Sequence, residues 1–459
     1  MSGISALNIA KDSLLSHQTA INITGSNIAN VNTEGYTRQR PIFCTIGSSN
    51  IGAGQVQYGV EVDQIQRIYD QFITYQIHEQ NQDIGYTEAK KEQLERIEII
   101  LNETTGEGID DLFNKFWNAW EDLSANPSGQ TEREALVSVT QSLTYVFRSY
   151  GDELVTLQKD VNSNISTLVD TINSDLSSIA ALNQKITQNA TGKGDTNIFR
   201  DERDKIVKEL AGIIEINYFE DASGALNVFI SNGLALVEEG RYSSLAVETN
   251  EDTYYDIIFE DAPGVAINSN ITSGKIAGLL EIRDTTTVSY LSSLNTLAAE
   301  LVQEVNDKHQ EGFDTGGNLG GNFFDATKTT ALTIEVDAAI IADVNKIAAS
   351  ETVNGDGNNA LNIAGLRDEL VLNSGSSTFI DYYSSFIGTV GQDVLYADRA
   401  FEHNTDLMEQ LTSKRESVSG VSIDEEMMSL IKYQTGYTAA ARLCTTVQAL
   451  VDDLLGLVG

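Results

Sequence analysis

The sequence predicts a mainly α-helical, elongated protein that carries a small inserted β domain, and therefore an α+β fold. The first observation behind this prediction is the helical spacing of apolar residues in long segments, at residues 67–102, 130–189, 275–310 and 378–415. The second is that only three prolines interrupt the 459 residues, which leaves room for long helices. The third is a change of period, because residues 215–260 contain short β-type runs separated by SG, NG and EG turns.

Both ends of the chain carry heptad-like patterns that predict coiled-coil packing. The segments between them run outward and return, so the terminal helices are expected to lie at one end of the molecule and to pair antiparallel. The N-terminal seam has a first line of four apolar residues and a mixed second line: Leu7, Leu14, Ile21 and Ile28, then Ala10, His17, Thr24 and Val31. The C-terminal seam alternates steps of three and four: Leu430, Tyr433, Tyr437, Ala440, Cys444, Val447, Val451, Leu454 and Val458.

Three further segments complete the expected order of elements. Residues 36–66 predict an extended arm, and residues 200–214 a helix that leads into the β-type runs. Residues 110–123 predict a helix with its aromatic residues on one face. That face is interpreted as rod core, with a ligand pocket as the less favoured alternative, and it contains Phe113, Phe116, Trp117 and Trp120.

The predicted organisation is nested and has three domains. The terminal coiled-coil domain and its arm combine residues 1–66 with 417–459. The helical rod domain combines residues 67–214 with 275–416. The small β domain between them is residues 215–274.

The charge of the chain limits the classes of partner. It has 29 Lys and Arg against 67 Asp and Glu, a net charge of −38, and such a surface repels nucleic acid and anionic membranes. No run of 18 apolar residues predicts a membrane span. Residues 1–60 carry +1 and residues 421–459 carry −3, so the 360 residues between them hold the remaining −36. Ends that are spared from charge are expected to be buried against something.

The N-terminal stretch MSGISALNIAKDSLLSHQ lacks the basic and apolar regions of a cleaved secretory signal. We therefore expect a cytoplasmic protein, or one exported by a route that reads no such signal. The two cysteines, Cys44 and Cys444, are too few for a disulfide framework.

No pattern in the sequence predicts catalysis, and neither a cofactor nor a metal is expected. The four histidines are scattered without ligand spacing. The glycine-rich stretch at residues 316–322 lacks the Gly-Lys-Ser/Thr ending of a phosphate loop. In NGDGNN, at residues 354–359, alternating oxygen ligands suggest calcium as an alternative to an ordinary turn. The turn is favoured because the twelfth position is Gly365 and not a bidentate Glu. Ser422 and Glu425 predict a capping box at the start of the last helix.

The stretch NIANVNTEGYTRQRP, residues 27–41, resembles the N-terminal signature of bacterial flagellar rod, hook and hook-associated proteins. Physically, Asn30 and Asn32 can satisfy groups at a helix end, and Gly35 can adopt a positive φ so that the chain turns into Tyr36. Four other stretches resemble the hook–filament junction branch of this family, the first hook-associated proteins, in the right order and over nearly the whole chain. They are DDLFNKFWNAWEDLSANPS, the helix-to-strand transition from NIFRDERDK to GLALVE, the returning helix from GKIAGLLEIR to NDKHQEGFD, and SGVSIDEEMMSLIKYQTGY.

The resemblance implies a structural protein outside the cell, in an adaptor ring at the hook–filament junction on which the second junction protein and the filament assemble. It implies contacts with the hook protein, the second hook-associated protein and further copies of the chain. It also implies export through the flagellar secretion apparatus, with a cytosolic chaperone on the C-terminal helix. The predicted assembly interface contains Leu7, Leu14, Ile21, Ile28, Asn30, Asn32, Gly35, Tyr36, Leu430, Tyr433, Tyr437, Cys444, Val447, Val451 and Leu454.

Two departures from the family pattern stand out. After GNFFDA the chain soon reaches its final helices, which leaves little room for the extra outer domain of longer relatives. Cysteines are uncommon in axial flagellar proteins, and whether Cys44 and Cys444 pair is left open. The alternatives are another axial protein, either the second junction protein or a hook or rod protein, and more remotely a cytosolic enzyme with helical arms.

Overall fold

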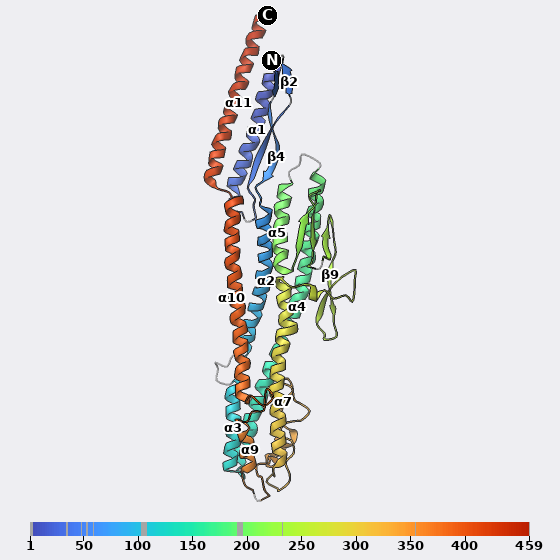
Figure 1. Cartoon of the computed structure of the whole chain (residues 1–459), viewed down its shortest axis with the longest axis vertical. Coiled ribbons are helices and arrows are strands. Elements are labelled where there is room, and N and C mark those ends of the chain that lie inside the picture. The colour runs from blue at the N-terminus through green and yellow to red at the C-terminus, as the bar shows by residue number, and fades with distance from the viewer. Residues whose placement is uncertain are drawn as a thin grey trace.

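The computed structural model describes residues 3–33, 35–46, 48–51, 54–57, 59–101, 108–190, 196–231, 233–353 and 355–458. The molecule is elongated, with both termini at one end and long helices running toward the other (Figure 1). It is mainly helical with small antiparallel sheets, as the sequence predicts. Among the helices of the described residues, none has the length and apolar character needed to cross a membrane.

The two terminal helices, α1 (Gly3–Ala29) and α11 (Ile423–Val458), pair antiparallel at the end that holds the termini (Figure 1). The direction follows from their contacts, because Asn27 near the end of α1 meets Glu426 at the start of α11, while His17 lies beside Tyr433. This confirms the predicted antiparallel arrangement. The arm beside them contains two hairpins, formed by β1 (Gln39–Thr45) with β4 (Val60–Arg67) and by β2 (Ser48–Ile51) with β3 (Gly54–Gln57).

Long helices that run out and back make the rod. The helix α6 continues through a π-helical turn, η2 (Ile282–Thr286), into α7. Two 3₁₀ turns, η1 (Asn268–Asn270) and η3 (Val344–Lys346), lie in the connections. The helices are α2 (Gln71–Ile100), α3 (Ile109–Ala125), α4 (Gln130–Ala190), α5 (Asn197–Ile213), α6 (Gly274–Glu281), α7 (Thr287–Glu311), α8 (Ala338–Ala342), α9 (Asn358–Gly365) and α10 (Phe379–Ser419).

The core of the rod follows the apolar stripes of these helices. At the distal end, the four aromatic residues of α3 are at most 1% exposed and contact rings from α4, α10 and the loop after α7. Such aromatic clusters contribute large buried areas and favourable ring geometry. The α3 residues are Phe113, Phe116, Trp117 and Trp120, and their partners include Phe147, Phe323, Phe324 and Phe379.

The inserted β domain contains a four-stranded antiparallel sheet in the order β5–β6–β7–β8 and a β9–β10 hairpin. Amide side chains of α4 bond to the backbone of the domain. Asn173 Nδ2 donates to the carbonyl of Leu245 and Asn173 Oδ1 accepts from its N–H, both at 2.8 Å. Asn183 Nδ2 donates to the carbonyl of Leu226 at 2.8 Å. The domain is therefore fixed on the rod. Its strands are β5 (Asn217–Glu220), β6 (Leu226–Phe229), β7 (Ala235–Glu238), β8 (Arg241–Tyr242), β9 (Leu245–Thr249) and β10 (Tyr255–Phe259).

The turn after α8 and η3 uses its carboxylate for the backbone. Asp356 accepts hydrogen bonds from the hydroxyl of Thr352 and from the N–H groups of Glu351, Thr352 and Asn358. The hydroxyl bond first, and then the bonds from the backbone, lower the pKa of Asp356 to about 2. No group of three potential metal-ligating side chains occurs among the described residues. The contacts of Asp356 are those of an ordinary turn.

Candidate assembly interface

Small side chains bring α1 and α11 into close contact. Ala10 and Ala20 of α1 are fully buried, and Ala440 and Val447 of α11 are 6% and 7% exposed. Gly436 permits a close approach, because a Cβ there would lie 2.5 Å from Cε1 of His17. The ring of His17 thus packs against the part of α11 where a glycine leaves room for it.

The buried line of α1 differs from the predicted seam. Leu7 is 37% exposed, and Leu14, Ile21 and Ile28 are only half-buried. The buried residues are Ala10 and Thr24, which belong to the second line of the predicted seam, together with Ser16, Ala20, Ile23 and Asn27. The reason is that α1 packs against two partners, α11 and the arm, and Ser16 Oγ donates to the carbonyl of Val60 on β4 at 2.8 Å. A heptad drawn for one helical partner misses the second.

The residues of the C-terminal seam are placed unequally. Val447 is buried, while Leu430, Tyr433 and Cys444 are half-buried. Tyr437 is 39% exposed, and its neighbour Gly436 lies against His17 in its place. Val451 is 37% exposed. Leu454 belongs to α11, but its side chain lies outside the described residues.

A buried hydrogen-bond network joins the N-terminal signature to the start of α11. Asn27 is 1% exposed and binds three segments with one amide. Its Nδ2 donates to the carbonyl of Gln39 at 2.8 Å and to Oε2 of Glu426 at 2.9 Å. Its Oδ1 accepts from the Tyr36 hydroxyl at 2.8 Å and from the N–H of Gln39 at 3.0 Å. The side chain therefore pairs with the edge of β1 as a neighbouring strand would.

Arg38 strengthens the same contact through a pair of carboxylates. Its Nε donates to Glu426 at 2.7 Å and its Nη1 to Glu425 at 2.8 Å. Burial alone would lower the pKa of Arg38, but hydrogen bonds to Glu425 and Glu426 raise it above its ordinary value. The carboxylate of Glu425 therefore points across to the arm, and this ion pair is the observed contact where a capping box is expected. Sequence reasoning missed the role of Asn27, Arg38 and Glu426. A signal was present, because the N-terminal signature contains an arginine and the C-terminal motif contains two adjacent glutamates that could pair with it.

The signature turn after α1 has the conformation its residues suggest. Asn30 Nδ2 donates to the carbonyl of Ser26 at 2.9 Å and so satisfies a group in the last turn of the helix. Gly35 has φ of +82°, in the left-handed region that favours glycine. Asn32 is exposed. The turn brings Tyr36 back onto Asn27.

A cluster of rings packs between the helices and the arm. The ring of His17 lies 6.0 Å from that of Phe43 on β1 and 6.4 Å from that of Tyr433 on α11, centroid to centroid. Burial lowers the pKa of His17, which favours the neutral ring. Phe43 thus faces the helices, and its neighbour Cys44 faces the other side of the strand, where its thiol lies 3.8 Å from Glu61 Oε1. No disulfide joins Cys44 to Cys444 in the described residues.

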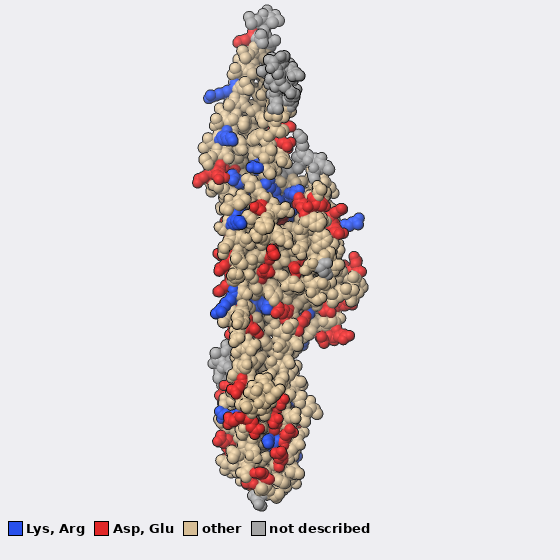
Figure 2. All heavy atoms as spheres, in the orientation of Figure 1, with Lys and Arg blue, Asp and Glu red and all other residues tan. Residues whose placement is uncertain are grey.

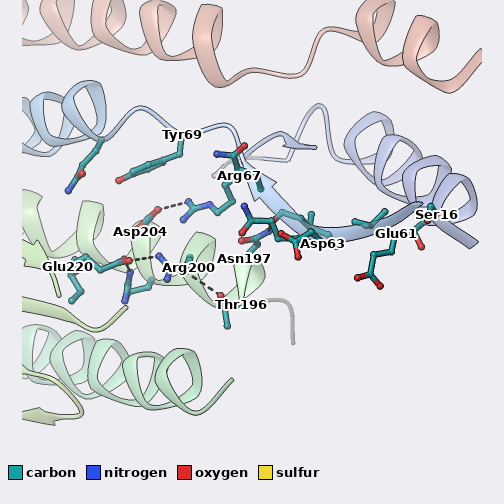
Figure 3. Close-up of a pocket in the computed structure, with 18 of the residues that line it drawn as sticks. Ser16, Glu61, Asp63, Arg67, Tyr69, Thr196, Asn197, Arg200, Asp204 and Glu220 are labelled. Carbon is teal, nitrogen blue, oxygen red and sulfur yellow. Dashed lines mark hydrogen bonds and ion pairs between the residues drawn. The ribbon is translucent and has the colours of Figure 1, made fainter. Parts of the chain in front are cut away.

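The joint between the terminal helices and the rod is hollow. A cavity of about 1080 Å³ lies between β4 and α5, and a second of about 1050 Å³ lies between the signature turn, α5 and the end of α10. Figure 3 shows Arg67 crossing the first cavity from β4 toward Asp204 on α5, beside Tyr69. Its Nη2 lies 2.6 Å from Asp204 and 2.8 Å from Asp201.

Large apolar side chains remain exposed on the terminal pair. Leu15 of α1 is 53% exposed, although a lone exposed leucine is ordinary on a protein surface. On α11, four such residues lie within nine positions. Exposed apolar residues that are grouped in this way indicate an interaction surface more strongly than a single one does. These four are Ile423, Met427, Met428 and Ile431, which are 51%, 45%, 65% and 59% exposed.

Comparison with known proteins identifies the family. The profile described as "Flagellar hook-associated protein FlgK helical domain" matches residues 94–324, about half of the chain. The chain belongs to the FlgK family. Two further profiles, of the flagellar basal body rod protein and of the FlgEFG C-terminal region, match residues 5–37 and 412–457. These two segments are α1 with its turn and α11 with the end of α10, so the terminal pair is the part this FlgK-family chain shares with other flagellar axial components.

Relatives match over the full length. The chain is 29% identical to Flagellar hook-associated protein 1 of Bacillus subtilis (strain 168), covering 99% of this chain and 98% of that protein. It is 27% identical to the proteins of that name from Escherichia coli (strain K12) and Salmonella typhimurium, covering 99% of this chain and 100% of each. These two alignments span 549 and 553 positions, more than the 459 residues here, so both relatives contain insertions that this chain lacks.

A solved structure shares the fold. The flagellar hook junction protein FlgK from Burkholderia pseudomallei matches with a TM-score of 0.67 and 16% identity, covering 75% of this chain and 100% of that one. As a FlgK-family member, the present chain is a hook-associated structural component of the bacterial flagellum.

Proposed function

We propose that this chain forms the adaptor ring at the hook–filament junction, on which the second junction protein and the filament assemble. In this proposal the ring consists of copies of this chain that lie side by side, and the hook protein lies on one side of the ring. Membership of the FlgK family supports the location, and the match of both terminal segments to other axial proteins supports contacts with them.

The single observation that carries the proposal is the unequal burial of the terminal pair. One side of α1 and α11 is sealed by small residues, whereas Tyr437, Val451 and Leu7 are each more than a third exposed. Fully burying a large apolar side chain contributes roughly 1.5–3 kcal/mol, so neighbouring subunits that cover these residues would gain stability. The predicted interface residues at these positions are thus available for contacts between subunits.

The division into three domains belongs to the same proposal. The terminal unit, residues 1–66 with 417–459, would make the contacts between subunits. The rod would be residues 67–214 with 275–416. The β domain, residues 215–274, would be attached to the rod. The packing of α1, α11 and the arm on one another supports the first unit.

Export without a cleaved signal, through the flagellar secretion apparatus, completes the proposal. A cytosolic chaperone on the C-terminal helix would cover the exposed Met427, Met428 and Ile431 before assembly. The protein would act outside the cell as a structural part, without catalysis, cofactor or metal.

Immunogold labelling of the tagged chain on intact flagella tests the proposed location. The expected result is label confined to the boundary between hook and filament. Label along the whole hook would favour a hook protein instead, and label that stays in the cytosol of broken cells would favour the enzyme alternative.

A further inference from the structure

The joint between the terminal pair and the rod is weakly held for a molecule of this length. The extensive packing contacts of α1, α11 and strands β1 to β4 are all with one another. The chain crosses from this unit to the rod at two places, between β4 and α2 and between α10 and α11. Each crossing is only three residues long, at residues 68–70 and 420–422.

Polar contacts to one helix bridge the joint. Arg67 at the end of β4 binds Asp201 and Asp204 of α5 and also donates to Thr37 Oγ1 at 3.2 Å. Asn197 Nδ2 at the start of α5 donates to the carbonyl of Ile65 at 2.8 Å. The side chain of Arg67 is only 10% exposed, so solvent and salt screen its ion pairs weakly.

The space around these contacts is open. The two large cavities both adjoin the joint, and Arg67, Tyr69 and Asp204 line both of them. Figure 3 shows this clamp spanning the gap between the arm and α5. Nε of Arg67 is buried without a hydrogen-bond partner among the described residues, so the clamp is not fully satisfied. A hollow joint with polar bridges can reorient without disturbing a packed core.

We infer that this joint is a hinge and that the Arg67 clamp on Asp201 and Asp204 is its lock. With the clamp closed, the terminal pair stands in line with the rod. When the clamp opens, the terminal pair tilts as a rigid body about residues 68–70 and 420–422. This gives a subunit a way to fit neighbours of different tilt, and it is a property of the free chain that does not depend on the proposed location.

The balance of charges supports this assignment. Burial alone would lower the pKa of Arg67, but Asp204 and Asp201 raise it above its ordinary value. Burial raises the pKa of Asp201. Removing the guanidinium would remove the attraction between the end of β4 and α5 and would leave the two carboxylates of α5 without their cation, which favours the open state.

Distances between two spin labels in the free chain test the hinge. In a background with Cys44→Ser and Cys444→Ala, labels at Gln434 of α11 and Glu402 of α10, both exposed, report the angle across the joint. The unsubstituted clamp should give one narrow distance distribution. Arg67→Gln, and separately the pair Asp201→Asn with Asp204→Asn, should broaden it or add a second maximum.

A matched control removes an arginine ion pair elsewhere in the rod. Arg96 lies 2.9 Å from Asp160, and both side chains are about half exposed, at 46% and 53%. Arg96→Gln should leave the distribution as narrow as before. A second label pair, Gln18 with Gln434 inside the terminal unit, should stay unchanged in every variant, which separates tilting from unfolding. Distributions that stay narrow in both clamp variants, or that are already broad with the clamp intact, would overturn the lock.

Discussion

Asn27 shows how one side chain can specify the turn that begins the arm. It bonds to Tyr36, Gln39 and Glu426, which lie 9, 12 and 399 residues away in sequence. Because it is buried, each group it satisfies would otherwise lose water without a replacement. The signature and the start of the last helix therefore function as one buried unit.

Replacing this amide should loosen the terminal pair. Asn27→Ala leaves the edge of Gln39 and one oxygen of Glu426 unsatisfied, and we expect a loss of about 2–3 kcal/mol in the free energy of unfolding. Hydrogen exchange over α1 and β1 measures it. The control is Asn32→Ala in the same turn, where the exposed side chain should make no measurable difference. Equal effects of the two substitutions would contradict the role of Asn27.

His309 predicts a loss of stability in mild acid. It is fully buried, its Nδ1–H donates to the carbonyl of Gly321 at 2.7 Å, and its Nε2 accepts from the N–H of Ala348 at 2.8 Å. Burial lowers its pKa to about 4, from an ordinary value of 6.5. Between these two pH values the unfolded chain binds a proton that the folded chain does not, so stability falls as the pH falls through this window.

The size of this loss follows from the width of the window. His309 alone should remove about 3 kcal/mol between pH 6.5 and pH 4, at 1.36 kcal/mol per unit. Burial also lowers the pKa of His78 to about 4, which adds a loss of the same sign. Urea unfolding at a series of pH values measures the slope of the free energy of unfolding against pH. This slope should be shallower for His309→Gln than for the unsubstituted chain. His403→Gln, at an exposed site, should keep the slope. An unchanged slope in His309→Gln would contradict the assignment.

The pairing of α1 with α11 depends on one glycine. Gly436 lies against His17, whose ring is itself held by Phe43 and Tyr433. The ring therefore has little room to move when a methyl group is added. The close approach of these two helices is the element-scale feature on which the assembly module rests.

Gly436→Ala should accordingly weaken the pair. We expect a destabilisation of about 1–3 kcal/mol from overpacking, seen as faster hydrogen exchange along α1 and α11. Gly25→Ala, within α1 and with nothing within 4 Å of the added Cβ, is the matched control. There the helix should gain up to about 1 kcal/mol. A stabilising Gly436→Ala would show that the helices are not in close contact.

The elements could be predicted from the sequence better than the faces they bury. Long apolar periods predicted the rod helices, and the change of period at residues 215–260 predicted the β domain. The predicted first line of the α1 seam, from Leu7 to Ile28, is not the buried line, because the arm also covers that helix through contacts such as Ser16 with Val60. Spacing within one segment carries no information about a second partner. Contacts between residues 399 positions apart, such as Asn27 with Glu426, follow from the folded arrangement alone.

The whole molecule is an acidic rod with one nearly neutral end, the end that holds both chain termini. On the face shown in Figure 2, Lys and Arg gather near the level of the joint, while Asp and Glu predominate toward the distal end. Residues 61–420 hold −36 of the net charge of −38. Copies that assemble side by side bring these like charges together, whereas the terminal pairs meet with little repulsion.

Assembly should therefore respond to salt. Like charges on neighbouring rods repel over a Debye length of about 10 Å at 0.1 M ionic strength, and added salt shortens that range. Light scattering of the purified chain on isolated hooks should show faster capping as salt rises. A rate that decreases steadily with salt would mean that attractive ion pairs between subunits outweigh the repulsion of the rods.

The central claim is that the exposed side of the terminal pair is the surface through which the chain joins the flagellum. Two substitutions on α11 separate that surface from the fold. Tyr437 is 39% exposed, so Tyr437→Glu should change the free energy of unfolding by no more than about 0.5 kcal/mol. Ala440 is 6% exposed, so Ala440→Glu should open the pair itself.

Electron microscopy of hooks from cells that carry only the Tyr437→Glu chain is the most direct measurement. We predict a variant that is exported and folded in the medium, on cells whose hooks end bare and carry no filament. Ala440→Glu should also leave bare hooks, but its chain should show rapid hydrogen exchange along α1. Capped hooks with normal filaments in the Tyr437→Glu cells would contradict the claim.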